Sequence, residues 1–483
     1  MNPKSVGRLL SYITLFMAGI LLVPTGVAFY YGESESVLAF SATIMPMLFL
    51  SALGMYLTRN NRELRVSVKD SYLFVTLSWV ILTFFGAIPL YITGVLENFS
   101  QCYFEIMSGF TTTGATAMTG IDVKPRGILF WRNMTNWLGG MGIVVLFVAV
   151  LPALGVRGTA LYGAESVGPT KDKLRPKIKE TAIVLWGIYL ALSIIEVVLL
   201  MLGGLDWFDA LTVMFGTMGA AGYVPHDASI AFYESKYVEW VCIIFMFLSG
   251  ANFALYYRVL QRQLRKLVKD AEFRLYCKIT LFATIFIALN LFFKGVYGIE
   301  ESVRNSAFQV VSFLTTTGFT NVNYSSWPMF SQSVLLILCF IGGCAGSAGG
   351  GIKVVRIGVM MRLFKNSMTR RIHPHASTVI KFGDNTFSEA TGEAIAGFVG
   401  FYIANVLVGT LVISLTDVDL VVALTSVLLT LGNIGIGLGG IGTDFTFAVF
   451  PDWAQWVFSF LMLVGRLELF TVYSIFTRDF WKR

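Results

Sequence analysis

Ten long apolar runs are the feature that most restricts the folds open to this 483-residue chain. Each has about 20 residues or more, enough for a helix to cross the roughly 30 Å hydrocarbon core of a bilayer. Backbone groups in lipid must be paired internally, and these runs lack the alternation of barrel strands. We therefore predict an all-α polytopic membrane protein with spans at 9–31, 38–57, 71–93, 128–152, 181–203, 237–257, 275–294, 330–361, 392–415 and 453–477.

The distribution of charge supports these spans and orients the chain. Only 13% of the residues are charged, about half the share typical of a soluble domain. Of the 36 Lys and Arg residues, 29 fall on one side of the predicted spans and six on the other, and Arg466 lies within a span. Because basic residues favour cytoplasmic loops, both termini are predicted to be cytoplasmic. Basic charge divided among short loops also argues against nucleic-acid binding.

A short motif recurs along the chain. The residues Thr-Thr-Thr-Gly at 111–114 return unchanged at 315–318, and looser copies lie at 219–223 and 432–436. Each copy follows an apolar stretch of about 13 residues, too short to span a bilayer and typical of a re-entrant segment. These stretches lie at 98–110, 206–218, 302–314 and 419–431.

The motif divides the chain into equivalent units. We predict four repeats of span, pore helix, filter loop and span (M1-P-M2) in a pseudo-fourfold arrangement, behind two N-terminal transmembrane helices. The N-terminal unit covers 1–66, and the repeats cover 67–155, 178–262, 270–366 and 388–480, the third with a broken second span.

Acidic residues precede or begin each short apolar stretch. A carboxylate at a helix N-terminus offsets the positive end of the helix dipole, so each half-helix is predicted to begin at the outer surface. Its negative C-terminal end then points toward the middle of the membrane. The acids are Glu97, Asp206, Asp209, Glu300, Glu301, Asp417 and Asp419.

Four such loops suit the passage of a monovalent cation. The ion must exchange its water for other oxygens, and a glycine-containing loop can expose a row of backbone carbonyls for that purpose. Threonine adds a hydroxyl without a charge that would trap the ion. Irregular backbone at membrane depth is tolerated where it lines such a cavity. The pattern therefore predicts a selectivity filter.

The fourfold plan, the two leading helices and the glycines Gly114, Gly222, Gly318 and Gly435 resemble the Trk/Ktr/HKT superfamily of potassium transport proteins, and most closely its bacterial TrkH members. The resemblance implies potassium uptake across the bacterial inner membrane, a homodimer and a cytoplasmic nucleotide-binding TrkA-like regulatory ring. Glycine in all four loops is typical of potassium-preferring members. The ion ligands implied are carbonyls of Thr112, Thr113, Ala220, Ala221, Thr316, Thr317, Asn433 and Ile434.

Residues 342–351 contain six glycines and no bulky side chain. A helix there is destabilised by about 1 kcal/mol for each Gly relative to Ala, so we predict a mobile intramembrane loop. Close helix packing through small residues is the alternative reading. The segment resembles the gating loop beneath the filter in this superfamily, which assigns gating to Gly343, Gly346, Gly349 and Gly350.

Arg466 lies within the last predicted span. An unpaired charge at that depth costs at least about 2.5–3.5 kcal/mol, so the side chain should face the pore or a partner. Glu468, two residues further on, points elsewhere on a helix. The resemblance makes Arg466 an electrostatic barrier under the filter. Glu196 fits either a hydrogen-bonded structural acid or an ion relay.

A secondary transporter and a membrane enzyme are the two alternative classes of function. A secondary transporter coupling potassium to protons or sodium would be expected to show inverted repeats, whereas these four units run in the same direction. A membrane enzyme is not expected, because the spans hold no nucleophile and base pair or metal cluster, and no cofactor is implied. The basic loops at 157–179, 258–278 and 353–381 fit either a docking surface or determinants of topology.

Overall fold

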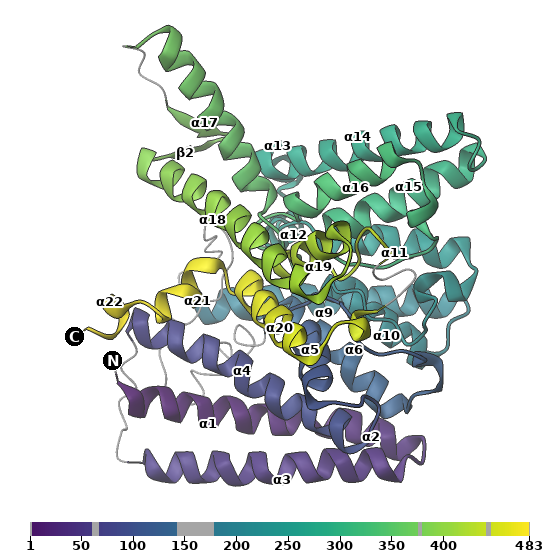
Figure 1. Ribbon diagram of the computed structural model, residues 1–483, viewed down its shortest axis with the longest axis vertical. Coiled ribbons are helices and arrows are strands. Elements are labelled where there is room, and N and C mark those ends of the chain that lie inside the picture. The colour runs from purple at the N-terminus through teal and green to yellow at the C-terminus, as the bar shows by residue number, and fades with distance from the viewer. Residues whose placement is uncertain (1, 60–66, 143–177, 375–378, 441–445, 483) are drawn as a thin grey trace.

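The computed structural model describes residues 2–59, 67–142, 178–374, 379–440 and 446–482. Six of the described helices are long and apolar enough to cross a bilayer, or eight when each of two bent helix pairs is counted as one span. The N-terminal unit consists of α1 (Pro3–Ile20) and α2 (Leu22–Tyr30), which together form one 28-residue span, and α3 (Ser34–Leu57). Both termini lie at the same side of the molecule (Figure 1).

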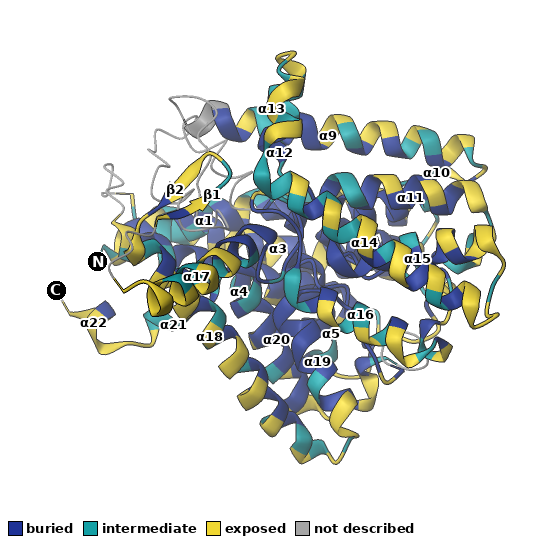
Figure 2. Cartoon of the chain, turned by 90° about the horizontal axis from the view of Figure 1, so that it is seen from above, coloured by how far each residue is buried: buried dark blue, intermediate teal, exposed yellow. Residues whose placement is uncertain are grey.

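Apolar side chains cover much of the outer surface. Helix α14 leaves Leu281, Phe282 and Phe286 more than half exposed, while the interior of the helix bundle is buried (Figure 2). Water would make such a surface unfavourable, whereas lipid accommodates it. The described chain therefore has the all-α architecture of a polytopic membrane protein, as predicted.

Four units follow the N-terminal helices, each with a first span, a half-helix and a second helix. Every half-helix begins and ends within three residues of its predicted bounds. The first spans are α4 (Val68–Ile92), α9 (Ile178–Leu202), α14 (Ala271–Phe293) and α18 (Glu389–Ile413). The half-helices are α5 (Phe99–Phe110), α10 (Trp207–Gly219), α15 (Ile299–Leu314) and α19 (Leu420–Gly432). The second helices are α6 (Arg126–Gly140), α11 (Lys236–Ser249), α16 (Met329–Ile341) and α20 (Asp452–Arg466).

The acidic residues sit at the half-helix N-termini in three of the four units. Asp206 accepts a hydrogen bond from the Asp209 backbone N–H (2.7 Å), and Asp419 accepts one from that of Val421 (3.0 Å). Glu300 and Glu301 lie in the first turn of α15. The first unit differs, because Asn98 rather than Glu97 occupies the N-cap of α5.

Two of the predicted spans, 237–257 and 453–477, each consist of two helices that meet at a sharp bend rather than of one continuous helix. Helix α11 bends by 94° into α12 (Phe253–Leu260), and α20 bends by 117° into α21 (Leu469–Ile475). A glycine at each bend packs against the end of a half-helix: a Cβ on Gly250 would lie 2.5 Å from Thr315, and one on Gly465 would lie 2.1 Å from the Leu431 carbonyl oxygen. In the first unit α6 ends at Gly140, and residues 143–152 of the predicted span 128–152 lie outside the described residues.

The third unit has the predicted break. Helix α16 ends at Ile341, and α17 (Val354–Ile372) begins after a non-helical segment. Backbone hydrogen bonds from Cys344 and Ala348 to the carbonyls of Gly250 and Ser249 (2.9 and 3.2 Å) hold this segment against the end of α11. Helix α17 then projects from the body of the molecule (Figure 1).

The remaining elements are short. Strands β1 (Ile380–Phe382) and β2 (Asn385–Phe387) form an antiparallel hairpin that pairs Ile380 with Phe387. The others are α13 (Leu264–Lys269), α22 (Arg478–Trp481) and 3-10 turns at Ile121–Val123, Ser229–Tyr233, Tyr324–Ser326, Ser414–Thr416 and Phe447–Val449.

Candidate functional site

The four glycine loops come together in a closed ring. Each of the four predicted filter glycines packs so tightly on the next loop that a Cβ would collide with the backbone of that loop. The colliding pairs are Gly114 with the Gly222 nitrogen (2.2 Å), Gly222 with the Gly318 carbonyl oxygen (2.6 Å), Gly318 with the Ile434 carbonyl oxygen (2.2 Å) and Gly435 with the Thr113 carbonyl oxygen (2.3 Å). Because the last contact returns to the first loop, no room is left for a side chain at any of the four positions.

The loops share a backbone conformation. The residue two positions before each glycine is left-handed, with φ of 56° at Thr112, 52° at Ala220, 61° at Thr316 and 54° at Asn433. A positive φ is unfavourable for any residue with a Cβ and persists only where the surrounding structure enforces it. The glycines of loops 1, 3 and 4 are also left-handed, whereas Gly222 is not. The second loop therefore departs from the pattern in structure as it does in sequence.

All four glycines line one cavity of about 60 Å³. Its wall also includes Thr116, Thr320, Arg132 and His226, which follow the glycine loops in the chain. The eight predicted carbonyl ligands flanking the glycines are fully buried: Thr112, Thr113, Ala220, Ala221, Thr316, Thr317, Asn433 and Ile434. We call the side of the ring at the glycines, which faces this cavity, the open side, and the side at the buried residues that precede them the closed side.

Side chains hold the first, third and fourth loops in place. The hydroxyls of Thr111 and Thr113 are hydrogen bonded to each other (2.9 Å), and so are those of Thr315 and Thr317 (2.8 Å). The Asn433 amide donates to Thr113 Oγ1 (2.9 Å), which ties the fourth loop to the first. These side-chain groups are engaged within the ring, which leaves the backbone carbonyls as the ligands available to an ion.

Arg466 lies at the break between α20 and α21, buried on the closed side of the ring. Its Nη1 donates to Thr112 Oγ1 (3.1 Å) and to the Ala348 carbonyl (2.7 Å). Its Nη2 donates to the carbonyls of Gly139 and Gly140, the latter at 3.0 Å. One guanidinium therefore joins the first glycine loop, the end of α6 and the 342–351 segment.

The 342–351 segment divides into two parts. The Gly350 N–H donates to Thr316 Oγ1 (2.7 Å), and a Cβ on Gly349 would lie 2.5 Å from the Thr315 carbonyl oxygen. These two predicted gate residues therefore lie directly against the ring. Gly343 and Gly346 instead pack on the bend between α11 and α12, against Gly250 and Asn252.

Ionic groups that the sequence reasoning did not assign fix the ends of this segment. Lys353 is buried with a φ of 87°, and its ammonium donates to the Gly349 carbonyl. Glu272 accepts from the backbone N–H groups of Ala345 (2.7 Å) and Val355 (3.1 Å). A lysine two residues after the last glycine of a glycine-rich segment was the available signal for Lys353.

The sequence left the roles of two acids open, Glu468 and Glu196. Glu468 forms an ion pair with Arg356 (2.6 Å), a residue of α17. Glu196 is fully buried in α9, beside Thr217 of the second half-helix. Neither carboxylate is among the residues that line the cavity over the glycines.

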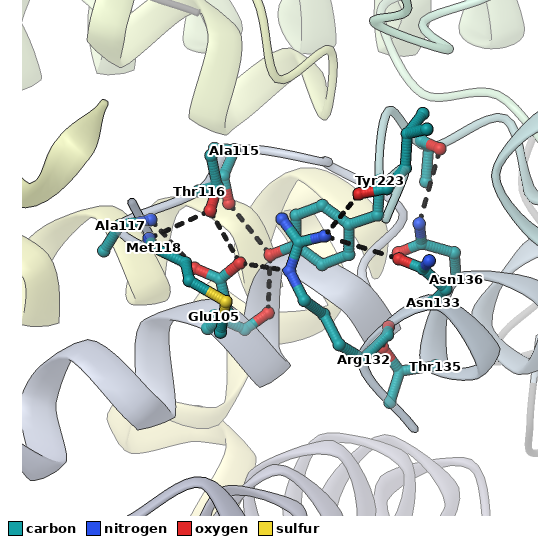
Figure 3. Close-up of polar contacts among 12 residues, drawn as sticks. Glu105, Ala115, Thr116, Ala117, Met118, Arg132, Asn133, Thr135, Asn136 and Tyr223 are labelled. Atoms are coloured by element: carbon teal, nitrogen blue, oxygen red, sulfur yellow. Dashed lines mark hydrogen bonds and ion pairs between the residues drawn. The ribbon is translucent and has the colours of Figure 1, made fainter. Parts of the chain in front are cut away.

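A buried network joins the first and second loops on the open side of the ring (Figure 3). Glu105 Oε1 accepts from Arg132 Nε (2.6 Å) and from Thr116 Oγ1 (2.8 Å), and Oε2 accepts from the Ala117 N–H (2.8 Å). The Arg132 guanidinium lies 3.5 Å over the Tyr223 ring. The Tyr223 hydroxyl donates to the carbonyls of Glu105 (2.7 Å) and Ala115 (2.9 Å).

His226 provides a second link between these units at the cavity wall. Its Nδ1 lies 2.6 Å from Asp122 Oδ1, and its Nε2 lies 3.3 Å from Asp209 Oδ2. Burial lowers the pKa of His226, but the hydrogen bonds to Asp209 and Asp122 outweigh it, so the pKa is raised above the ordinary value of 6.5. The carboxylates thus favour the imidazolium beside the start of α10.

Comparison with known proteins gives a consistent result. The TrkH family model, described as cation transport protein, matches residues 38–482. The chain is 39% identical to the Trk system potassium uptake protein TrkH of Escherichia coli K12 and 37% identical to that of Halomonas elongata, with each alignment covering both chains completely. The crystal structure of the potassium transporter TrkH from Vibrio parahaemolyticus superposes with a TM-score of 0.89 over both full chains, at 34% identity. These relatives are named as transport proteins rather than enzymes.

Proposed function

Because the chain belongs to the TrkH family of cation transport proteins, we propose that it takes up potassium across the bacterial inner membrane through a channel-like pore. The observation that carries this proposal is the closed ring of four loops, whose glycines all line one cavity. The ring is the selectivity filter, and the cavity is its outer mouth. In this arrangement both termini are cytoplasmic.

The chemistry follows from the backbone. A potassium ion entering the ring exchanges its hydration shell for carbonyl oxygens of the residues that precede the four glycines. The half-helices end at the ring, so their negative C-terminal dipoles favour a cation there. The ligands carry no formal charge, which lets the ion leave again. Potassium is the transported species rather than a cofactor, and the proposal includes no cofactor.

The 342–351 segment and Arg466 form the gate in this proposal. Gly349, Gly350 and the Arg466 guanidinium lie against the closed side of the ring. A positive charge at that position opposes a cation leaving the filter toward the cytoplasm. Opening then requires the segment to withdraw from the third and fourth loops and Arg466 to release the Ala348 carbonyl.

The proposal includes two partners. A second copy of the chain completes a homodimer, and a TrkA-like nucleotide-binding ring on the cytoplasmic side acts on the gate. A secondary transporter that couples potassium to protons or sodium is the rival function. The ring favours the channel-like function, because a row of carbonyls conducts an ion without a titratable relay.

Rescue of a potassium-uptake-deficient bacterial strain tests the function. The gene should restore growth at submillimolar potassium, and currents in proteoliposomes should reverse at the potassium equilibrium potential at every pH. Reversal that shifts with the proton or sodium gradient would establish coupling instead, and absence of rescue by protein present in the membrane would contradict potassium uptake.

A further inference from the structure

The network of Glu105, Arg132 and Tyr223 performs no step in the proposed ion passage, yet it is built into the filter. All three side chains are at most 1% exposed. Glu105 belongs to the first half-helix and Arg132 to α6, while Tyr223 directly follows the second filter glycine. The network therefore crosses from the first repeat to the second.

Its contacts fall immediately beyond the filter glycines. The Glu105 carboxylate holds Thr116 and Ala117, two and three residues after Gly114. Arg132 Nη1 reaches the Val224 carbonyl (3.3 Å), two residues after Gly222. We call the residues that directly follow each filter glycine the outgoing strand of that loop, although they form no β-sheet. One ion pair is therefore hydrogen bonded to the outgoing strands of two adjacent filter loops, and a shift of either partner displaces both loops.

The third repeat has an uncharged side chain at the position equivalent to Glu105. Gln309 precedes Gly318 by the same nine residues that separate Glu105 from Gly114. Its amide donates to Asn321 (3.1 Å), three residues after Gly318, and Asn321 donates to Asn305 (2.9 Å). This position supports the outgoing strand in both repeats, but only the first repeat uses an ion pair that extends to a neighbouring loop.

We propose that the Glu105–Arg132 ion pair is a positioning element that fixes the first filter loop against the second and thereby sets the preference for potassium over sodium. This inference rests on the proposed function. Selectivity by backbone carbonyls depends on their spacing and number, so a change in the separation of two of four loops alters the preference. The ion pair stands behind the loops and is not itself a ligand.

Charge adds to the effect of geometry. Arg132 lines the cavity over the four glycines, where an uncompensated positive charge would repel an entering cation. Glu105, fully buried beside it, neutralises that charge. Breaking a buried pair by removing one partner leaves the other charge uncompensated, so the loss of Glu105 alone has a larger effect than its hydrogen bonds suggest.

The test measures the potassium-to-sodium permeability ratio of the full-length protein in proteoliposomes. The wild-type protein is measured first. A permeability ratio near one would contradict the proposed function itself, whereas a high ratio provides the value with which the ratios of the variants are compared. Glu105→Gln should lower the ratio by about tenfold or more and raise the potassium concentration for half-maximal flux. Glu105→Asp, which keeps the charge but withdraws it from Thr116 and Ala117, should change the ratio in the same direction.

Glu239→Gln is the matched control. It breaks another buried ion pair, between Glu239 of α11 and Arg304 of α15, which joins the second and third repeats without contacting an outgoing filter strand. Its thermal stability should fall while its permeability ratio stays at the wild-type value. An unchanged ratio in either folded Glu105 variant, or an equal fall in Glu239→Gln, would overturn the inference.

Discussion

Replacing Gly318 with serine should reduce the potassium-to-sodium permeability ratio by about tenfold or more. The backbone of Gly318 is left-handed, with a φ of 79°, and a Cβ would lie 2.2 Å from the Ile434 carbonyl oxygen. The left-handed angle alone costs a residue with a side chain about 1–2 kcal/mol. Because the colliding atom is backbone, the third and fourth loops must separate, which enlarges the ring and weakens its fit to potassium.

Gly295→Ser separates this effect from backbone strain. Gly295 lies in the same repeat with a φ of 70°, but nothing stands within 4 Å of the position of its Cβ. It should keep the wild-type ratio, since it carries similar strain away from the ring. Selectivity is measured by competing rubidium and sodium uptake in cells that express equal amounts of protein. A Gly318→Ser variant with the wild-type ratio would remove Gly318 from the filter.

Arg466→Ala should raise potassium flux by about tenfold. The substitution removes the charge proposed as the barrier and the hydrogen bond that ties Arg466 to the Ala348 carbonyl of the proposed gate. A hydrogen bond from a charged donor contributes about 1.5–3 kcal/mol, and about 1.4 kcal/mol changes an equilibrium tenfold. Unidirectional rubidium flux into proteoliposomes of known protein content measures the change.

Arg466→Lys distinguishes the two contributions of this side chain. Lysine keeps the charge but has no planar fork to reach Thr112, Ala348 and the end of α6 together. Flux between that of wild type and Arg466→Ala would assign part of the closure to the hydrogen bonds. Unchanged flux in correctly folded Arg466→Ala would contradict its role in the gate.

The half-helices could be predicted from the sequence because their signals are local. Length separates them from full spans, and acids at their starts fix their direction, as Asp206 and Asp419 do through backbone hydrogen bonds. The bends of the second spans could not be predicted in the same way. Gly250 and Gly465 are single glycines within apolar runs, and only the approach of another half-helix makes them indispensable there.

Some residues of the candidate site could likewise be predicted from local sequence signals, whereas others could not. The glycines, Arg466 and the 342–351 segment stand out in the sequence, because glycine and a lone charge are unusual within apolar runs. Glu105 and Arg132 are also single charges within predicted apolar segments, but nothing in the sequence pairs them: they lie 27 residues apart, and Tyr223 comes from another repeat. Pairing of this kind depends on how the repeats pack and cannot be read from either residue alone.

Anomalous X-ray scattering from crystals grown in rubidium shows whether the ring of loops binds the transported ion, because rubidium replaces potassium and marks its own position. A peak should appear on the axis of the ring, between the carbonyls of Thr113, Ala221, Thr317 and Ile434. Rubidium bound elsewhere in the protein, with no peak at the ring, would contradict the account.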